Sequence, residues 1–569
     1  MDACWGAELV NGPSLVSGAT DVPLLDLTIG QAVARAAERW GNNDAVVAVE
    51  QGVRWSYAEL LARADALASG LLELGLGPGD RIGIWSPNCA EWTLTQFAAA
   101  RAGLILVTIN PAYRLSEVEY TINNVGLRAL VAAERFKSSA YPEMIEELAP
   151  EIIRKGAGPL RAERLPTLEA AILINGAPRP GWLRFDDLAS SKACPERLEA
   201  VERGIRPEDA TNIQFTSGTT GLPKGATLTH RGILNNGYFV GRAMNLGDTD
   251  RICIPVPLYH CFGMVMGNLA ALTHGAAMIY PSSAFDPVAV LHAVEKERCT
   301  ALYGVPTMLI AVLAQPELDS ADMSSLRTGC MAGALCPEPL MREVMQRLNM
   351  SQVTIAYGMT ETSPVSFQTV PDDSIERRTT TVGRVQPHLE SKIVDESGAI
   401  VPRGTPGELC TRGYSVMLGY WGDSVQTAAA IDEDGWMHSG DIAILDEAGY
   451  GSVVGRIKDM VIRGGENIYP REIEDFLRRH PAVEDVAVVG VPDERMGEEV
   501  CAWISLRHGQ ALAEQDVRTY CQGQIAHYKI PRYIHIVESF PTTVTGKIQK
   551  FRIREAMEEA LAADAAGRA

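Results

Sequence analysis

Apolar strand-like segments alternate with helix-like segments from about residue 28, and this alternation limits the folds available to the chain. Arg81-Ile82-Gly83-Ile84-Trp85, Leu104–Ile109 and Ala129–Ala132 have the apolar composition of buried strands. Strands that alternate with helices form parallel sheets whose two faces are both covered. The sequence therefore predicts an α/β protein with a large N-terminal domain of parallel sheets layered with helices.

Capping signals mark where the intervening helices begin. Ser56 with Glu59, and Ser116 with Glu119, each have the spacing of a capping box. Apolar residues at helical spacing follow Ser56, and a further helix is expected over Glu91–Ala102. The Gly-rich segment 75–79 follows a helix and precedes a strand, which is the reverse of the order in a dinucleotide-binding loop, so we interpret it as a turn.

The C-terminal hundred residues have a different order of expected helices and strands, and they predict a small, mobile α+β domain. Helices are expected from Pro470 to Leu477 and over Ala513–Tyr520, and strands over Val486–Val491, Val500–Leu506 and Tyr533–Val537. A unit of this size can form its own core. Upstream, four prolines between residues 178 and 207 indicate a surface connection.

Composition excludes several classes of protein. The 569 residues carry a net charge of −20, which disfavours a protein that binds nucleic acid or anionic membrane through its whole surface. The eleven cysteines show no CxxC pair and no metal-ligand cluster with histidine, which predicts reduced, mostly buried thiols and a cytoplasmic location. The N-terminus has no signal-peptide pattern. The most apolar stretch, Met264–Tyr280, is too short to span a bilayer and predicts a buried helix plus strand.

The segment Thr216-Ser217-Gly218-Thr219-Thr220-Gly221-Leu222-Pro223-Lys224-Gly225 is the most informative in the chain. Glycines allow close backbone approach, hydroxyls supply donors and a lysine supplies charge, which together suit a polyphosphate. The order of residues around the lysine is not that of a Walker A loop. A flexible Gly/Thr surface loop is the alternative interpretation.

This loop resembles the phosphate signature of the adenylate-forming family, which includes acyl-CoA synthetases, beetle luciferases and adenylation domains of peptide synthetases. Further segments resemble that family's motifs in the same order along nearly the whole chain. They are Pro257-Leu258-Tyr259-His260-Cys261-Phe262-Gly263, Tyr357-Gly358-Met359-Thr360-Glu361-Thr362, Gly435-Trp436-Met437-His438-Ser439-Gly440-Asp441, Gly455-Arg456-Ile457-Lys458-Asp459 and Pro541-Thr542-Thr543-Val544-Thr545-Gly546-Lys547.

The resemblance implies an ATP site. It makes Tyr357 the adenine-stacking residue and Asp441 the acceptor of the ribose hydroxyls, although a tyrosine before glycine can equally anchor a core and an aspartate after Ser-Gly can be a turn acid. Thr360 would reach the α-phosphate and Glu361 would hold Mg²⁺; the same pair could be a helix N-cap with its first-turn acid. The full set of implied ATP/AMP contacts is Thr216, Ser217, Gly218, Thr219, Thr220, Gly221, Leu222, Pro223, Lys224, Gly333, Ala334, Leu335, Tyr357, Gly358, Met359, Thr360, Asp441, Arg456 and Lys547.

The resemblance also implies two half-reactions, with a boundary between domains 1–457 and 458–569. Lys547 would be the adenylation lysine, since an ammonium group stabilises charge that builds on the transferring phosphate. Lys458 would be the hinge, or otherwise a plain surface lysine. Gly464 and Gly465 would present backbone to CoA. Catalysis would thus rest on Lys547, Thr360 and His260.

The acid is less constrained by the sequence. His260, in the gate motif, would shape the acyl pocket, but a histidine in an apolar run can also be a satisfied core residue. His260, Gly263, Met264, Val305, Met308 and Met359 are expected to line this pocket, and the methionines could equally be ordinary core. The chain most resembles bacterial medium- to long-chain fatty-acyl-CoA synthetases, with aryl-acid (coumarate- or benzoate-type) CoA ligases as the alternative.

The predicted reaction is therefore an ATP-dependent ligation of a carboxylic acid to CoA through acyl-AMP, with ATP, Mg²⁺ and CoA as cofactor and co-substrates. There are two alternatives: a non-catalytic nucleotide-binding protein, and an acyl-AMP ligase that loads a carrier protein. An oxidative luciferase is possible on the same fold, and nothing in the motifs distinguishes one. The expected partners are small molecules, with no nucleic acid and no integral membrane segment. The oligomeric state is open, a homodimer among the options.

Overall fold

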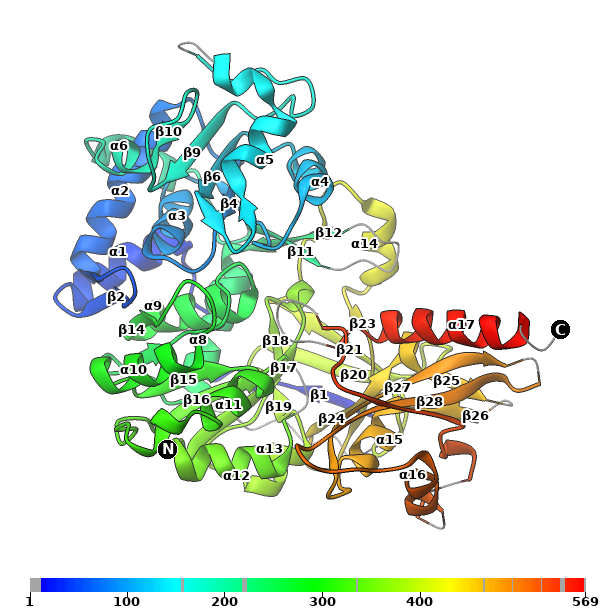
Figure 1. Cartoon of the computed structure of the whole chain (residues 1–569). Coiled ribbons are helices and arrows are strands. Elements are labelled where there is room, and N and C mark those ends of the chain that lie inside the picture. Colours follow the sequence, from blue (N-terminus) through cyan, green and yellow to red (C-terminus); the bar gives the residue numbers. More distant parts are fainter. Residues whose placement is uncertain are drawn as a thin grey trace. The chain divides into compact units, whose positions relative to one another are not determined.

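The computed structural model describes residues 12–154, 158–216, 223–333, 336–463, 466–493, 495–522, 524–525, 527–542 and 548–566 (Figure 1). The chain forms two compact units. The larger contains Val16–Ser391 and Thr411–Met437, and the smaller contains Leu9–Leu15, Lys392–Cys410 and His438–Ala569. No helix among the described residues is both long enough and apolar enough to cross a membrane.

Two large sheets form the framework of the larger unit. In the eight-stranded sheet, the strands from β10 to β11 run parallel and β12 and β22 are antiparallel. Its spatial order is β10 (Leu183–Arg184), β9 (Ala170–Ile174), β6 (Ala129–Ala133), β4 (Arg81–Trp85), β5 (Ile105–Thr108), β11 (Ala210–Thr216), β12 (Lys224–Thr229) and β22 (Gly419–Tyr420).

The nine-stranded sheet is parallel in its centre and antiparallel at both edges. Its spatial order is β19 (Arg384–Val385), β18 (Val365–Gln368), β17 (Gln352–Gly358), β16 (Thr328–Ala332), β15 (Ala301–Gly304), β13 (Arg251–Cys253), β14 (Ala277–Tyr280), β2 (Asp44–Ala48) and β3 (Val53–Ser56).

Alternate residues of each strand enter different cores, as expected for sheets covered on both faces. Ile82 and Ile84 of β4 pack in a core shared with the second sheet, whereas Trp85 packs in a separate core. The shared core holds α1 (Ile29–Trp40), α2 (Tyr57–Glu73), α3 (Ala90–Arg101), α8 (His230–Ala243), the π-helix η2 (Phe262–Leu269) and α9 (Ala270–His274).

Other helices cover the outer faces of the two sheets (Figure 1). These are α4 (Leu115–Val125) and α5 (Tyr141–Leu148) on the eight-stranded sheet, and α10 (Pro287–Glu297), α11 (Pro306–Leu313) and α12 (Glu338–Arg347) on the nine-stranded sheet. The remaining short elements of the larger unit are β7 (Arg135–Phe136), β8 (Ser139–Ala140), η1 (Pro150–Arg154), η3 (Pro316–Asp319), α13 (Ile375–Thr380) and α14 (Ser424–Ala430).

The predicted elements of this unit are confirmed apart from their ends, and one capping box is wrong. Ser56 and Glu59 form the predicted box at the start of α2. Helix α4, however, begins one residue before Ser116, so Glu117 lies at the capping position and accepts from the Arg114 N–H. Glu119 lies two residues further along and pairs with Arg164 instead.

Three further expectations are tested in the larger unit. The predicted turn is confirmed, with positive φ at Gly75 and Gly79. The apolar stretch 264–280 is helix followed by strand, as predicted. The Pro-rich connection is more structured than expected, because its short helices α6 (Phe185–Ala189) and α7 (Pro195–Glu202) bury Phe185 and Leu198.

All ten cysteines in the described residues are free thiols, and only one of these ten is not buried.

The smaller unit contains the predicted α+β elements. Its sheet pairs a long antiparallel hairpin, β27 (Val483–Asp493) with β28 (Gly497–Leu506), and β29 (Tyr533–Val537) runs parallel to β28. The sheet is completed by β25 (Val461–Arg463) and β26 (Glu466–Ile468), and the helical elements are α15 (Pro470–Leu477), α16 (Glu514–Cys521), η6 (His527–Lys529) and α17 (Lys550–Ala566).

A second, five-stranded sheet precedes these elements in the chain. Its order is β1 (Leu15–Ser17), β20 (Leu389–Val394), β21 (Gly407–Gly413), β23 (Met437–Leu445) and β24 (Gly451–Arg456). The smaller compact unit therefore contains the chain from His438 onward, so it begins before Lys458 in the sequence. That Lys458 is the point about which a domain turns remains a prediction.

Candidate active site

A β-hairpin holds the two ends of the predicted phosphate loop. Thr216 ends β11, Lys224 begins β12, and these two residues are directly paired across the antiparallel ladder. The loop therefore starts and finishes at neighbouring positions on a rigid sheet. Its central residues, Ser217, Gly218, Thr219, Thr220, Gly221 and Leu222, lie outside the described residues.

The predicted metal ligand, Glu361, lies against one end of this hairpin. Its carboxyl Oε1 accepts hydrogen bonds from Thr216 Oγ1 at 3.3 Å and from the Tyr420 phenol at 2.9 Å. Glu361 is 6% exposed. The structure thus brings the loop and the predicted metal ligand together, and it adds Tyr420.

The interpretation of Thr360 and Glu361 as the start of a helix is wrong. They belong to η4 (Thr360–Thr362), a single 3₁₀ turn that ends at Ser363 with φ +69°. A turn this short has no aligned series of peptide dipoles, so it cannot add a helix N-terminal field to a phosphate site. Any preference for anions here must come from individual donors.

Tyr420 also connects Glu361 with the loop lysine. Lys224 Nζ lies 5.0 Å from the centre of the Tyr420 ring and donates to Gln426 Oε1 at 2.6 Å. Burial, followed by the Glu361 charge, raises the pKa of Tyr420 far above its usual value, so the phenol remains a hydrogen-bond donor. A single sequence marks neither Tyr420 nor Gln426 as functional, because their role depends on strands far apart in the chain.

A small pocket opens beside this lysine. It encloses about 150 Å³, enough for a few water molecules or a small anionic group. Its lining combines aromatic rings with amide and ammonium groups from separate elements: Tyr120, Asn124, Pro223, Lys224, Gly225, Tyr420, Trp421, Asp423 and Gln426. The predicted residues Pro223 and Lys224 are therefore on an accessible surface.

The predicted adenine segment lies at the carboxyl edge of the nine-stranded sheet. Strands β15, β16 and β17 are parallel neighbours, so the residues that follow them meet at one edge. Val305, Gly333 and Met359 occupy these positions. Gly333 has φ +82°, and a Cβ built on it would lie 3.3 Å from Val305 Cγ1. Ala334 and Leu335 lie outside the described residues.

Tyr357 is half-buried at the end of β17, where its ring meets Phe367 edge-on at 6.4 Å. The next residue, Gly358, lies so close to the neighbouring strand that a Cβ would be 1.8 Å from the Pro364 carbonyl oxygen. This close approach fixes the strand end that carries Tyr357.

The gate histidine is exposed, which argues against its being a satisfied core residue. His260 lies two residues before the start of the π-helix η2, and its Nδ1 accepts from the Phe262 N–H at 3.2 Å. Single π-helical segments often mark functional sites. Gly263 packs tightly there, since a Cβ would lie 2.4 Å from the Pro257 carbonyl.

The remaining residues predicted for the acyl pocket share one core cluster. Met264 and Met308 are buried in it, and Val305 and Met359 are half-buried against it. Met264 is 1% exposed and its sulfur accepts from Gln214 Nε2 at 3.0 Å, which fits a core role. Their role in acid binding remains a prediction.

The predicted ribose residues are paired within the smaller unit. Asp441 on β23 lies opposite Arg456 on β24, and Arg456 Nε is 2.8 Å from Asp441 Oδ1. Asp441 is 5% exposed, whereas the Arg456 side chain is 40% exposed. The guanidinium therefore neutralises a buried carboxylate while its own outer edge stays accessible.

The predicted hinge and the residues after it are only partly described. Lys458 is exposed in the 3₁₀ turn η5 (Ile457–Asp459) that directly follows Arg456. Gly464, Gly465 and Lys547 lie outside the described residues. Their roles toward CoA and in adenylation stay predictions.

Comparisons with known proteins bear on these expectations. The model of the family described as "AMP-binding enzyme" matches residues 33–421, and that of the "AMP-binding enzyme C-terminal domain" matches residues 472–547. The chain belongs to the AMP-binding enzyme family. The resemblance to adenylate-forming enzymes is thereby confirmed.

Full-length relatives agree with this assignment. The medium-chain acyl-CoA ligase ACSF2 (mitochondrial) of Danio rerio is 47% identical over 96% of this chain and 91% of its own length. Two solved structures are similar over nearly the whole chain. The anthranilate CoA ligase AuaEII in complex with anthranoyl-AMP has a TM-score of 0.82 and 27% identity, and the match covers 95% of this chain and 99% of that chain. ATP-bound MatB from Rhodopseudomonas palustris has a TM-score of 0.81 and 28% identity, and the match covers 94% of this chain and 100% of that chain. The predicted fold class and the predicted enzyme class, an AMP-forming acyl-CoA synthetase that uses ATP, are confirmed.

Proposed function

We propose that the chain activates a medium-chain fatty acid with Mg²⁺ and ATP and transfers the acyl group to CoA. The observation that carries this proposal is the buried Glu361 carboxylate between Thr216 and Tyr420, at the base of the phosphate loop. The same carboxylate would be an unexplained buried charge in a protein without a cation there.

The residues around Glu361 fit a magnesium ion. Both side-chain hydrogen bonds that Glu361 receives from described residues end on Oε1, which leaves Oε2 as a hard oxygen ligand. Thr216 and Tyr420 would orient the carboxylate. When bound, the ion would neutralise charge on the ATP phosphates.

The first half-reaction would form acyl-AMP. A carboxylate oxygen of the acid attacks the α-phosphorus of ATP, and the bond from that phosphorus to the pyrophosphate oxygen breaks. Lys224 and Lys547 would balance negative charge that grows on the phosphates, because preorganised cations act strongly on developing charge. Asp441 would accept the ribose hydroxyls, and Tyr357 would lie against the adenine.

The second half-reaction would release AMP. The CoA sulfur attacks the acyl carbon, and the bond between that carbon and the phosphate oxygen breaks. We propose that Gly464 and Gly465 present backbone to CoA after rotation about Lys458, as the family resemblance implies. No covalent intermediate with the protein is required.

A medium-chain acid is favoured by the relatives and by the residue chemistry. The Danio rerio relative is named a medium-chain acyl-CoA ligase, and Val305, Met308 and Met359 are apolar. An aryl acid is the second candidate, because AuaEII is an anthranilate CoA ligase of closely similar fold. The Danio rerio relative is mitochondrial by name, whereas the sequence predicts a cytoplasmic location for this chain. Microscopy of the tagged chain would distinguish the two locations.

The experiment is a panel of acids with the purified protein, ATP, Mg²⁺ and CoA, read by pyrophosphate release and by thioester formation. Saturated acids from four to eighteen carbons would be compared with benzoate, coumarate and anthranilate. An optimum at about eight to twelve carbons supports the proposal. An optimum on the aryl acids would replace it, and pyrophosphate release without thioester would redirect the second step toward a carrier protein.

A further inference from the structure

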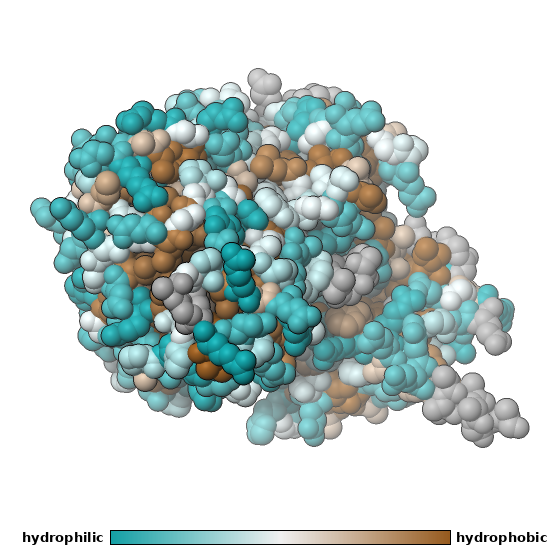
Figure 2. All heavy atoms as spheres, turned by 90° about the horizontal axis from the view of Figure 1, so that it is seen from above, coloured by the Kyte–Doolittle hydropathy of each residue, from teal (hydrophilic) through white to brown (hydrophobic). Residues whose placement is uncertain are grey.

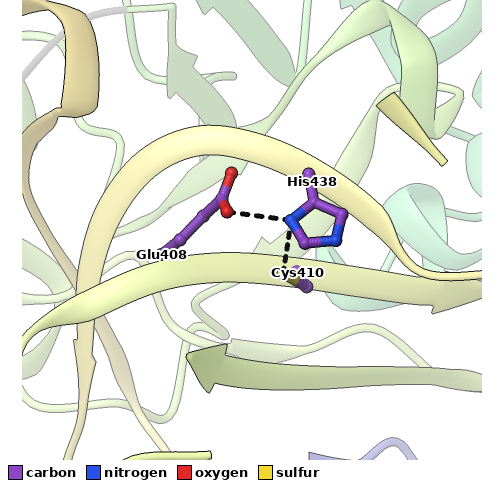
Figure 3. A group of neighbouring side chains, drawn as sticks. All are labelled: Glu408, Cys410 and His438. Carbon is purple, nitrogen blue, oxygen red and sulfur yellow. Dashed lines mark hydrogen bonds and ion pairs between the residues drawn. The ribbon is translucent and has the colours of Figure 1, made fainter. Parts of the chain in front are cut away.

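The smaller unit brings together three side chains whose grouping the sequence does not indicate. Glu408 and Cys410 lie on the same face of β21, and His438 lies on the adjacent strand β23 (Figure 3). Their ligand atoms, a carboxylate oxygen, a thiol sulfur and an imidazole nitrogen, all lie within 4.8 Å of one another. The sequence shows no such cluster, because His438 lies 28 positions from Cys410 and 30 positions from Glu408.

We propose that Glu408, Cys410 and His438 form a binding site for a thiophilic divalent cation such as Zn²⁺. One sulfur, one nitrogen and one oxygen ligand suit borderline-soft metals, whereas Mg²⁺ and Ca²⁺ take oxygen ligands. The site is separate from Glu361, which lies in the larger unit. The proposal concerns metal binding and does not depend on the acid or on CoA.

The two distances from the His438 nitrogen are close to those of a tetrahedral centre. His438 Nδ1 lies 3.5 Å from Cys410 Sγ and 2.8 Å from Glu408 Oε2. Usual Zn–S, Zn–N and Zn–O lengths at tetrahedral angles place ligand atoms roughly 3.4 to 3.6 Å apart. The nitrogen–sulfur separation already matches this value. The nitrogen–oxygen separation, now that of a hydrogen bond, has to open by about half an ångström.

Burial also fits a site with one protected ligand and an open side. Cys410 is fully buried, whereas the Glu408 and His438 side chains are 20% and 31% exposed. A cation can therefore reach the sulfur from the carboxylate–imidazole side, and a water molecule can complete the coordination. Three protein ligands plus water is a common zinc arrangement.

A backbone hydrogen bond holds the Glu408 carboxylate in place. The Gly440 N–H donates to Glu408 Oε1 at 3.0 Å, so the other oxygen, Oε2, is presented to His438. Such outer contacts orient metal ligands and support their affinity. A bound ion would take the place of the Cys410 thiol hydrogen and of the hydrogen between His438 Nδ1 and Glu408 Oε2, and both would leave to solvent as protons.

Co²⁺ is a direct probe, because its bond to a thiolate gives an intense charge-transfer absorption. We expect the full chain to bind one Co²⁺ with this absorption, and Zn²⁺ to displace it. Cys410→Ser removes the absorption, and His438→Gln and Glu408→Gln weaken binding roughly tenfold or more. The matched control Cys194→Ser, at the partly exposed cysteine, keeps it.

Circular dichroism of each variant shows whether it has folded, and Zn²⁺ is expected to raise the unfolding temperature of the wild type but not of Cys410→Ser. The proposal is overturned if the folded wild type gives no thiolate absorption with Co²⁺. It is equally overturned if Cys194→Ser loses the absorption while Cys410→Ser keeps it. Neither result bears on adenylation, which is measured separately by pyrophosphate release.

Discussion

The phenol oxygen of Tyr420 lies 2.9 Å from Oε1 of Glu361 and donates to it. These residues are 59 positions apart in the sequence, on β22 and on the turn after β17. The contact links the hairpin sheet that carries the phosphate loop to the sheet edge that carries the predicted adenine residues. It gives the buried carboxylate a fixed orientation.

Tyr420→Phe should raise the Mg²⁺ concentration that activity requires. A hydrogen bond to a charged group contributes about 1.5–3 kcal/mol, which corresponds to roughly a 10- to 150-fold higher Mg²⁺ requirement if the whole contact serves the ion. Pyrophosphate release titrated with Mg²⁺ at fixed ATP measures this. Tyr238→Phe removes a phenol elsewhere in the same unit and should leave the titration unchanged. An unaltered Mg²⁺ curve for Tyr420→Phe would contradict the orienting role.

Asp441→Asn should impair ATP use. The carboxylate is 5% exposed and is paired with Arg456, so the substitution turns one acceptor oxygen into an NH₂ donor and removes the negative charge that pairs with the guanidinium. We expect KM for ATP to rise at least about tenfold, by analogy with the loss of one charged hydrogen bond. Asp395→Asn, an exposed turn acid, is the control. Normal ATP affinity in a folded Asp441→Asn protein would remove Asp441 from the nucleotide site.

Lys547→Ala should separate the two half-reactions. If Lys547 stabilises charge on the transferring phosphate, the variant loses pyrophosphate release from ATP and acid but still makes thioester from supplied acyl-AMP and CoA. Lys296→Ala, on the surface of α10, serves as the control. Equal loss of both steps would argue against two conformations that present different residues to the site.

Stability should fall on acidification because two histidines of the larger unit, the buried His230 and the half-buried His274, resist protonation. Burial lowers the pKa of His230 and of His274 to about 4, and Nδ1 of His230 already accepts from the Ile29 N–H. Between about pH 6.5 and 4 the unfolded chain binds more protons than the folded one, so stability is present above this window and is lost as pH falls through it.

The expected loss is on the order of 2 kcal/mol per histidine between pH 7 and pH 5. Urea unfolding followed by tryptophan fluorescence at both pH values measures it. His274→Gln should reduce the difference between the two midpoints, whereas His292→Gln, at an exposed position, should not. A midpoint that does not move between pH 7 and pH 5 would refute the assignment.

Gly358→Ala should destabilise the larger unit. The added methyl would lie 1.8 Å from the Pro364 carbonyl oxygen, so the strand end has to move. Overpacking of this kind costs about 1–3 kcal/mol or more and should lower the unfolding temperature. Gly77→Ala is the matched control, since nothing lies within 4 Å of its added Cβ. Similar unfolding temperatures for the two variants would show that the strand end yields freely.

Sequence patterns predicted the elements more reliably than their ends or their partners. Strand Arg81–Trp85 and helix Pro470–Leu477 agree residue for residue, since apolar periodicity and a first-turn proline are local signals. The box at Ser116 failed, because Ser and Glu recur at this spacing by chance and the helix began one residue earlier. The sequence does not indicate the short helices that contain Phe185 and Leu198, because prolines are frequent in this segment.

Figure 2 shows hydrophilic residues around separate hydrophobic patches on the face seen, and this pattern does not locate a site. The short motifs name candidate site residues instead, because each motif holds its chemistry within a few consecutive residues. Among the candidates, Thr216 contacts Glu361 in the larger unit, and Asp441 contacts Arg456 in the smaller unit.

The sequence by itself determined the fold class, the family and the type of reaction, since these rest on local periodicity and contiguous motifs. Only the tertiary structure showed that Tyr420 orients Glu361, that Gln426 holds Lys224, and that Glu408, Cys410 and His438 converge. The physical reason is that these contacts form between strands, a turn and a helix that lie far apart in the chain. Their register and crossover connections bring together side chains separated by 28 to 202 positions, and no local pattern records that separation.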